Sequence, residues 1–197
     1  MEKLKMIEGI RLSEYTERFM GREERARMAL SDIVTSDKVD LLLRLGYTTA
    51  PASTCYHGAY EGGLFDHSWY MSRVLSILTE KLDLKWGRKD SPAVIALLHD
   101  LCKLDRYRYF KNDGELVIEM NDNDKFKDFD GHGNKSVQII EHLNLLQLTE
   151  EELSCIRYHM GAYDPYDTLQ LSEVSKKFPN LYFVQLADCI VSQLMEV

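Results

Sequence analysis

The sequence predicts an all-α protein, a helical bundle that carries a small β-hairpin near residues 106–120. Two observations support this fold class. Apolar residues recur at helical spacing along most of the chain. The segment Asn112-Asp113-Gly114 lies between two runs rich in aromatic and apolar residues, which is typical of a hairpin turn. A length of 197 residues and a hydrophobic content of 45% suit one domain with a sizeable core.

The expected elements follow from this periodicity and from glycine and proline as stop signals. Helices are expected over residues 10–34, 37–45, 64–82, 93–102, 132–145, 149–160 and 180–195. Residues 47–62 are expected to form a loop. We interpret residues 1–36 as an N-terminal helical appendage and residues 37–197 as the main domain.

Two helix starts carry specific signals. Ser91 is the expected N-cap of a helix with Pro92 at its first position. That helix is apolar nearly all round, so we expect it to be central and buried. Thr149 and Glu152 form a capping box, which opens a helix to about Met160. A loop rich in Tyr, Asp and Pro is expected between that helix and the last one.

The charge distribution argues against a long nucleic acid as a partner. The net charge is −8, and there is no long basic run. The densest positive stretch extends from Lys103 to Lys111, directly after the dipeptide His99-Asp100. This stretch suits a small phosphorylated ligand, or it protects a hairpin edge from strand pairing; both interpretations stay open.

The cysteines and the hydropathy indicate the compartment. The four cysteines are scattered without a CxxC motif and are interpreted as reduced thiols, mostly buried. We find no signal peptide, no apolar stretch of about 18 residues and no lipidation motif. We therefore expect a cytoplasmic protein that does not bind a membrane. The sequence does not predict an oligomeric state.

The dipeptide His99-Asp100 is the strongest functional signal. A neutral imidazole and a carboxylate are both good ligands for a divalent metal. Neighbouring residues on one helix point about 100° apart, so both reach one ion only near a helix end or in a crowded cleft.

Other helices carry an ionisable residue on the face that should be buried. His67, His132 and His159 share faces with apolar residues, and Asp188 lies on the apolar stripe of the last helix. A buried carboxylate without a partner costs several kcal/mol. No Lys or Arg lies within one helical turn of Asp188. A shared metal ion explains these residues together, although any one histidine alone fits a core or capping role.

The order of these motifs resembles the HD-domain metal-dependent phosphohydrolase superfamily. TAPASTCYHGAYEGGLFDHS, ALLHDLCK, GHGNKS, IRYHMG and LADCI are similar to small HD hydrolases of bacteria and their phages. That group resembles the catalytic domain of HD-type 3′-to-5′ exoribonucleases. The resemblance covers about residues 40–195 and implies an HD-domain helical bundle.

The resemblance also implies a set of ligands. His67, His99, Asp100 and Asp188 should hold one metal, and His132 and His159 match the additional ligands of members with two metals, with Asp100 as the bridge. One or two divalent ions are expected. The mixed ligands suit Mn²⁺, Fe²⁺, Co²⁺, Ni²⁺ or Zn²⁺ better than Mg²⁺ alone.

Further residues are candidates for catalysis or substrate binding. Lys103 matches a lysine that contacts substrate phosphate in many HD enzymes, and its alternative role is a cation at a helix end. Arg106 is a second candidate for phosphate. His57 could protonate a leaving group, or merely cap its loop. Tyr163 could line a base pocket, or pack at the rim.

These residues lead to a metal-dependent phosphohydrolase. Its expected substrate is a nucleotide or other small phosphate ester, attacked by a metal-activated water that Asp100 orients. One alternative is a phosphodiesterase or 3′-to-5′ exonuclease acting on short oligonucleotides or cyclic dinucleotides. A third hypothesis is a metal or nucleotide sensor without catalysis.

Overall fold

The computed structural model describes residues 20–113, 115–121, 131–163, 168–195 and 197. Its α-helices are α3 (Arg22–Ser31), α4 (Ser36–Arg44), α5 (Gly63–Leu82), α6 (Ser91–Leu98), α7 (Lys103–Arg106), α8 (His132–His142), α9 (Glu150–Arg157), α10 (Thr168–Lys177) and α11 (Leu181–Cys189). A short 3-10 helix, η1 (Gly161–Tyr163), precedes α10, and a π-helix, η2 (Ile190–Met195), continues α11.

The β-hairpin lies where the sequence predicts it. β1 (Tyr107–Asn112) pairs antiparallel with β2 (Glu115–Met120), and Asn112 lies opposite Glu115. Asp113 adopts a φ of 51°, in the left-handed region that this kind of tight turn requires. Helices and one small hairpin make up the regular structure of the described residues, which confirms the all-α class with its hairpin.

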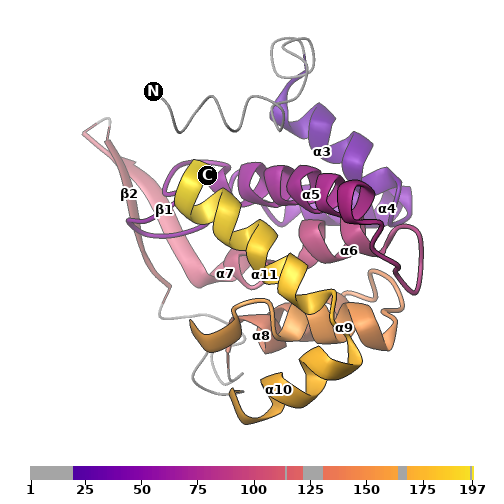
Figure 1. Ribbon diagram of the computed structural model, residues 1–197. Helices are drawn as coiled ribbons and strands as arrows, with labels where there is room; N and C mark the ends of the chain where they lie inside the picture. Colours follow the sequence, from indigo (N-terminus) through magenta and orange to yellow (C-terminus); the bar gives the residue numbers. More distant parts are fainter. Residues whose placement is uncertain (1–19, 114, 122–130, 164–167, 196) are drawn as a thin grey trace.

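Figure 1 shows α5 and α11 lying side by side across the middle of the molecule, with α3 and α4 at one end and α8, α9 and α10 at the other. α6 packs against both α5 and α9. The hairpin projects from one side, beyond α7. The end of α6 therefore lies between the other helices.

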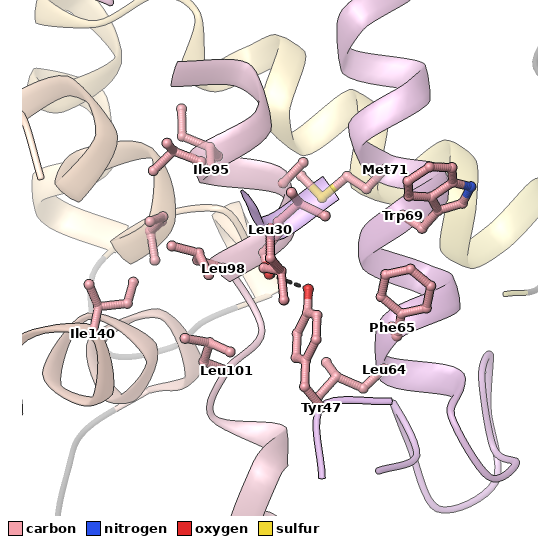
Figure 2. Close-up of a cluster of buried hydrophobic side chains, with 14 of the residues drawn as sticks. Leu30, Tyr47, Leu64, Phe65, Trp69, Met71, Ile95, Leu98, Leu101 and Ile140 are labelled. Carbon is pink, nitrogen blue, oxygen red and sulfur yellow. Dashed lines mark hydrogen bonds between the residues drawn. The ribbon is translucent and has the colours of Figure 1, made fainter. Parts of the chain in front are cut away.

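The core surrounds α6. Every residue of α6 is buried except Ala93, because the helix is apolar on all sides, as its sequence predicts. Figure 2 shows Tyr47 pointing into the same core from the loop that follows α4. Its hydroxyl donates a hydrogen bond to the backbone oxygen of Leu97, so this buried polar atom is satisfied.

The start of α6 differs from the prediction. Asp90 is the N-cap, and Ser91 is already helical. The Ser91 hydroxyl instead donates to Oε1 of Glu152 at 2.7 Å, and Arg88 donates to both oxygens of that fully buried carboxylate. The need to satisfy the charge of Glu152 decides where Ser91 points. The capping box of Thr149 and Glu152 is present as predicted.

Several helix ends also differ. α6 ends at Leu98 rather than at Cys102, α8 at His142 rather than at Leu145, and α9 at Arg157 rather than near Met160. The helix α10 was not expected, because its apolar residues are few and follow a segment that reads as a loop.

The predicted appendage is described only from residue 20 onward. Its helix α3 buries Ala26 and Leu30 in the common core. Arg22 forms a salt bridge with Asp66 of α5 at 2.9 Å. The division at residue 36 stays a prediction. In the described part of the chain, the longest and most apolar helices still fall short of what a membrane span requires.

Candidate metal centre

His99 and Asp100 lie at the end of a helix. His99 is the C-cap of α6, and Asp100 follows in the turn that leads into α7. The helical backbone ends here, so adjacent side chains can turn toward the same place. Ligand atoms of His67, His99 and Asp100 all lie within 4.8 Å of one another, and all three side chains are buried.

Four residues form the group that we name the first ligand group: His67, His99, Asp188 and Oδ2 of Asp100. Nε2 of His67 lies 3.2 Å from Nε2 of His99 and 3.1 Å from Oδ1 of Asp188. Oδ2 of Asp100 lies 3.5 Å from Nε2 of His99 and 4.0 Å from Nε2 of His67. Ligands about 2.1 Å from one ion are separated by about 3.0–4.2 Å, depending on the angle between them. His67, His99 and Asp100 therefore have the spacing of a single coordination sphere, and Asp188 lies beside His67 at the same site.

Three histidine rings turn the same nitrogen toward this place. Nδ1 of His67 bonds the backbone oxygen of Val197 at 2.8 Å, Nδ1 of His99 that of Ala96 at 2.9 Å, and Nδ1 of His159 that of Ile156 at 2.7 Å. A backbone oxygen only accepts hydrogen bonds, so each Nδ1 carries a proton. In a neutral ring, Nε2 then holds a free lone pair. This arrangement of the second nitrogen is the usual one in metal-bound histidines.

The two oxygens of Asp100 face different neighbours. Oδ2 belongs to the first ligand group, whereas Oδ1 lies 3.8 Å from Nε2 of His159 and 3.7 Å from Sγ of Cys102. Ligand atoms of Asp100, Cys102 and His132 lie within 4.8 Å of one another. We name Cys102, His132 and Oδ1 of Asp100 the second ligand group, with His159 beside it. A carboxylate placed in this way can bridge two ions.

The protonation states of His99, His132 and the two carboxylates suit cation binding. Burial lowers the pKa of His99 to about 4 and, together with the cation of Lys103, that of His132 to about 3. Both rings are therefore neutral at pH 7. Burial alone would raise the pKa values of Asp100 and Asp188. The Lys103 cation and the histidines outweigh this for Asp100, and His67 lowers the pKa of Asp188 to about 2.

One nitrogen of this cluster lacks a hydrogen bond within the described part of the chain. Nδ1 of His132 is buried and makes no hydrogen bond to any other described residue. An unsatisfied buried nitrogen is costly, and a bound ligand relieves that cost. Neutral imidazoles, two carboxylates and this orphaned nitrogen together fit a divalent metal.

The comparison with protein families agrees with this centre. The sequence matches the family model of the HD domain over residues 64–191. The chain belongs to the HD-domain family. Members of this superfamily are metal-dependent phosphohydrolases, and the match includes every residue of both ligand groups. No curated protein and no solved structure matches the chain.

Lys103, from the basic stretch, lies close to the centre of this HD domain. Lys103 is buried, and its ammonium lies 5.7 Å from the centroid of the Tyr107 ring. Burial lowers the pKa of Lys103, but the Asp100 carboxylate outweighs it and the pKa is raised, so the lysine stays charged. Arg108, in the same basic stretch, is exposed and pairs with Glu119 across the hairpin at 3.1 Å. Only part of the basic stretch therefore acts on the centre.

Arg106 is the second cation near the HD centre. Its charge helps to lower the pKa of His132, and its buried Nε makes no hydrogen bond to a described residue. A bound anion would give this nitrogen a partner. The predicted role in substrate binding stays a prediction.

His57 lies beside the first ligand group. Its ring centroid is 5.0 Å from that of His67, and the ring is partly accessible to solvent. Burial and the neighbouring His67 lower the pKa of His57. The side chain of Tyr163, which the sequence offers as a lining of a base pocket, lies outside the described residues.

Cys102 is the residue that the sequence did not assign to the site. Its sulfur is fully buried next to Asp100, where burial and that carboxylate raise the pKa of the thiol to about 12. The only sequence signal was its position two residues after Asp100. Where a helix ends, a spacing of two residues does not determine whether the two side chains face each other.

Proposed function

We propose that this HD-domain protein is a metal-dependent phosphohydrolase that acts on a nucleotide or other small phosphate ester. The observation that supports this most is the arrangement around Asp100. The Nε2 atoms of three histidines lie around an ionised carboxylate that has separate neighbours at its two oxygens. We propose the first ligand group as one metal site and Asp100, His132 and His159 as ligands of a second.

Each residue has a distinct task in this proposal. A divalent cation held there would act as a Lewis acid and lower the pKa of a nucleophilic water. Asp100 is kept ionised by its surroundings and orients that water as a hydrogen-bond acceptor. Lys103 and Arg106 neutralise charge on the phosphoryl oxygens as it develops in the transition state.

His57 is the proposed donor to the leaving oxygen. Unlike His67 and His99, it is partly exposed and lies at the edge of the cluster. Its lowered pKa makes the protonated form a stronger acid, while a smaller fraction of the ring carries that proton at pH 7. Proton transfer from His57 would avoid the release of an unprotonated alkoxide.

The chemistry of the neighbouring residues favours a small substrate. Among the described residues, Lys103 and Arg106 are the cations whose charges act on His132, and the net charge of the chain is −8. Such a site can neutralise one or two phosphates but offers little to a long polyanion. We expect Mn²⁺, Fe²⁺, Co²⁺, Ni²⁺ or Zn²⁺ rather than Mg²⁺ alone, and a cytoplasmic location.

A metal analysis followed by a substrate panel tests this proposal. The purified protein should contain a transition metal near stoichiometry and release phosphate or a nucleotide from nucleoside phosphates. The Asp100→Ala variant should lose metal and activity, whereas Asp40→Ala, which changes an exposed carboxylate, should keep both. Metal below about a tenth of an equivalent, with no gain on reconstitution, would contradict the centre.

The same panel separates the alternatives. Hydrolysis of short oligonucleotides or cyclic dinucleotides, without hydrolysis of mononucleotides, would make the protein a phosphodiesterase or exonuclease. If the fully metal-loaded protein hydrolyses none of these compounds nor an aryl phosphodiester, the sensor hypothesis replaces catalysis.

A further inference from the structure

Cys102 occupies a place that suits a metal ligand rather than a core residue. Its side chain is fully buried, and its sulfur lies 3.7 Å from Oδ1 of Asp100. Its backbone N–H donates to Oγ of Ser136 on α8 at 3.1 Å, so the turn that carries it is fixed against the helix of His132. Two separate elements thus hold the sulfur and the imidazole of the second ligand group together.

The distance between sulfur and oxygen fits shared coordination. A metal–sulfur bond of about 2.3 Å and a metal–oxygen bond of about 2.1 Å place the two atoms about 3.6 Å apart at a tetrahedral angle. The observed separation is 3.7 Å. The sulfur also faces the oxygen of Asp100 that the first ligand group does not use.

The unpartnered nitrogen gives an independent indication of a ligand at this place. Nδ1 of His132 is buried without a hydrogen-bond partner among the described residues, and its ring lies in the same group as Cys102. A cation bound by the sulfur, Oδ1 and Nδ1 of His132 would give that nitrogen a partner.

We propose that Cys102 is a thiolate ligand of the second metal position, which it shares with Asp100 and His132. The proposal rests on the metal centre of the proposed function and specifies its second site. When the sulfur–metal bond forms, the thiol releases its proton to solvent. A thiolate favours Zn²⁺, Co²⁺ or Fe²⁺ over Mg²⁺ and Mn²⁺ at this position.

A titration with Co²⁺ tests the proposal on the full chain after chelation and dialysis. Visible d–d bands report any tightly bound Co²⁺, and a thiolate-to-cobalt charge-transfer band in the near ultraviolet reports a sulfur ligand. The wild type should show both kinds of band at saturation. Cys102→Ser should keep the d–d bands and lose at least nine-tenths of the charge-transfer absorbance.

Matched variants exclude the two exposed thiols. Cys189 is exposed next to Asp188, and Cys55 is exposed in the loop of His57. Cys189→Ser and Cys55→Ser should both keep the charge-transfer band. The affinity for Zn²⁺ at the second position should be at least ~10-fold lower in Cys102→Ser than in the wild type. Even the loss of a residue that only supports a metal ligand lowers the metal affinity by ~10–100-fold.

The outcomes separate this inference from the proposed function. The d–d bands without a charge-transfer band in the wild type would overturn the role of Cys102 and leave the metal centre intact. The absence of both kinds of band would contradict the metal centre itself. If Cys102→Ser does not fold, ¹¹³Cd NMR of the wild type decides, because a sulfur ligand shifts one cadmium resonance strongly downfield of a site with nitrogen and oxygen ligands alone.

Discussion

At the scale of single residues, hydrogen bonds to the backbone fix the orientation of three of the proposed metal ligands. Each of His67, His99 and His159 donates from Nδ1 to a carbonyl oxygen and leaves Nε2 free. The ring orientation is therefore fixed before an ion arrives, which reduces the entropy lost on binding. Nothing in the residue type alone specifies which nitrogen faces the centre.

Lys103 gives a prediction at this scale. An ammonium does not coordinate a cation, so Lys103→Ala should keep the bound metal. It should lower kcat/KM for a phosphate substrate by roughly 10- to 1000-fold, because stabilisation of transition-state charge is lost. Metal analysis and steady-state kinetics on the same preparation measure both effects.

Arg108→Ala is the matched control for Lys103. It removes a positive charge from the same stretch of sequence, but this guanidinium pairs with Glu119 on the hairpin. Its kcat/KM should stay within a factor of about two of the wild type. Equal losses in both variants would mean that the net charge, rather than a specific contact, matters.

At the scale of elements, the approach of α8 to the end of α9 positions the second ligand group. Gly133 follows His132 in α8, and a Cβ there would lie 2.0 Å from the backbone oxygen of Arg157 and 2.5 Å from that of Ile156. The oxygen of Ile156 is the acceptor for His159. Glycine at this position thus lets two helices meet where their histidines converge.

Gly133→Ala should therefore disturb both stability and metal binding. The clash is with backbone rather than with a flexible side chain, so we expect a loss of about 3 kcal/mol in unfolding free energy. The second metal equivalent should bind more weakly. Urea unfolding and isothermal titration with Zn²⁺ measure these effects.

Gly21→Ala serves as the control, because a Cβ there meets no atom within 4 Å. It changes only the N-cap of α3 and should cost no more than about 1 kcal/mol. If both glycine variants are equally stable, close packing of α8 on α9 is not required for the fold.

At the scale of the whole molecule, the centre connects elements from distant parts of the sequence. His67 comes from α5, His99 and Asp100 from the end of α6, and Asp188 from α11. A metal bound to all of them acts as a crosslink that only the folded state can form. Ligands of this kind stabilise by mass action.

We expect a chelator to lower the Tm of the wild type by roughly 6–12 °C, because about 3 kcal/mol of binding energy is lost in a chain of this size. Asp188→Asn keeps the side-chain volume but removes the charged ligand. Its Tm should be lower from the outset and respond much less to chelator. Differential scanning calorimetry with and without chelator measures both values. The crosslink would be contradicted if the chelator left the Tm of the wild type unchanged and Asp188→Asn had the same Tm as the wild type.

Much of the architecture could be predicted from the sequence because it depends on local patterns. Helical spacing predicted that the segment before His99 would be buried on all sides, and Asn112-Asp113-Gly114 predicted the hairpin turn. Thr149 and Glu152 interact within one helical turn, so their capping box was also predictable. The family could be recognised because its motifs occur in order along the chain.

The tertiary structure decided which atoms meet. His67 and Asp188 lie far apart in sequence. The distance of 3.1 Å between Nε2 of His67 and Oδ1 of Asp188 depends on how α11 packs on α5. Ser91 turned toward Glu152 rather than capping its own helix, since a buried carboxylate requires partners. Cys102 faces Asp100 because α6 ends at Leu98, four residues earlier than the apolar pattern indicates. Periodicity specifies which face of an element is buried, but contacts between elements depend on packing that no local pattern contains.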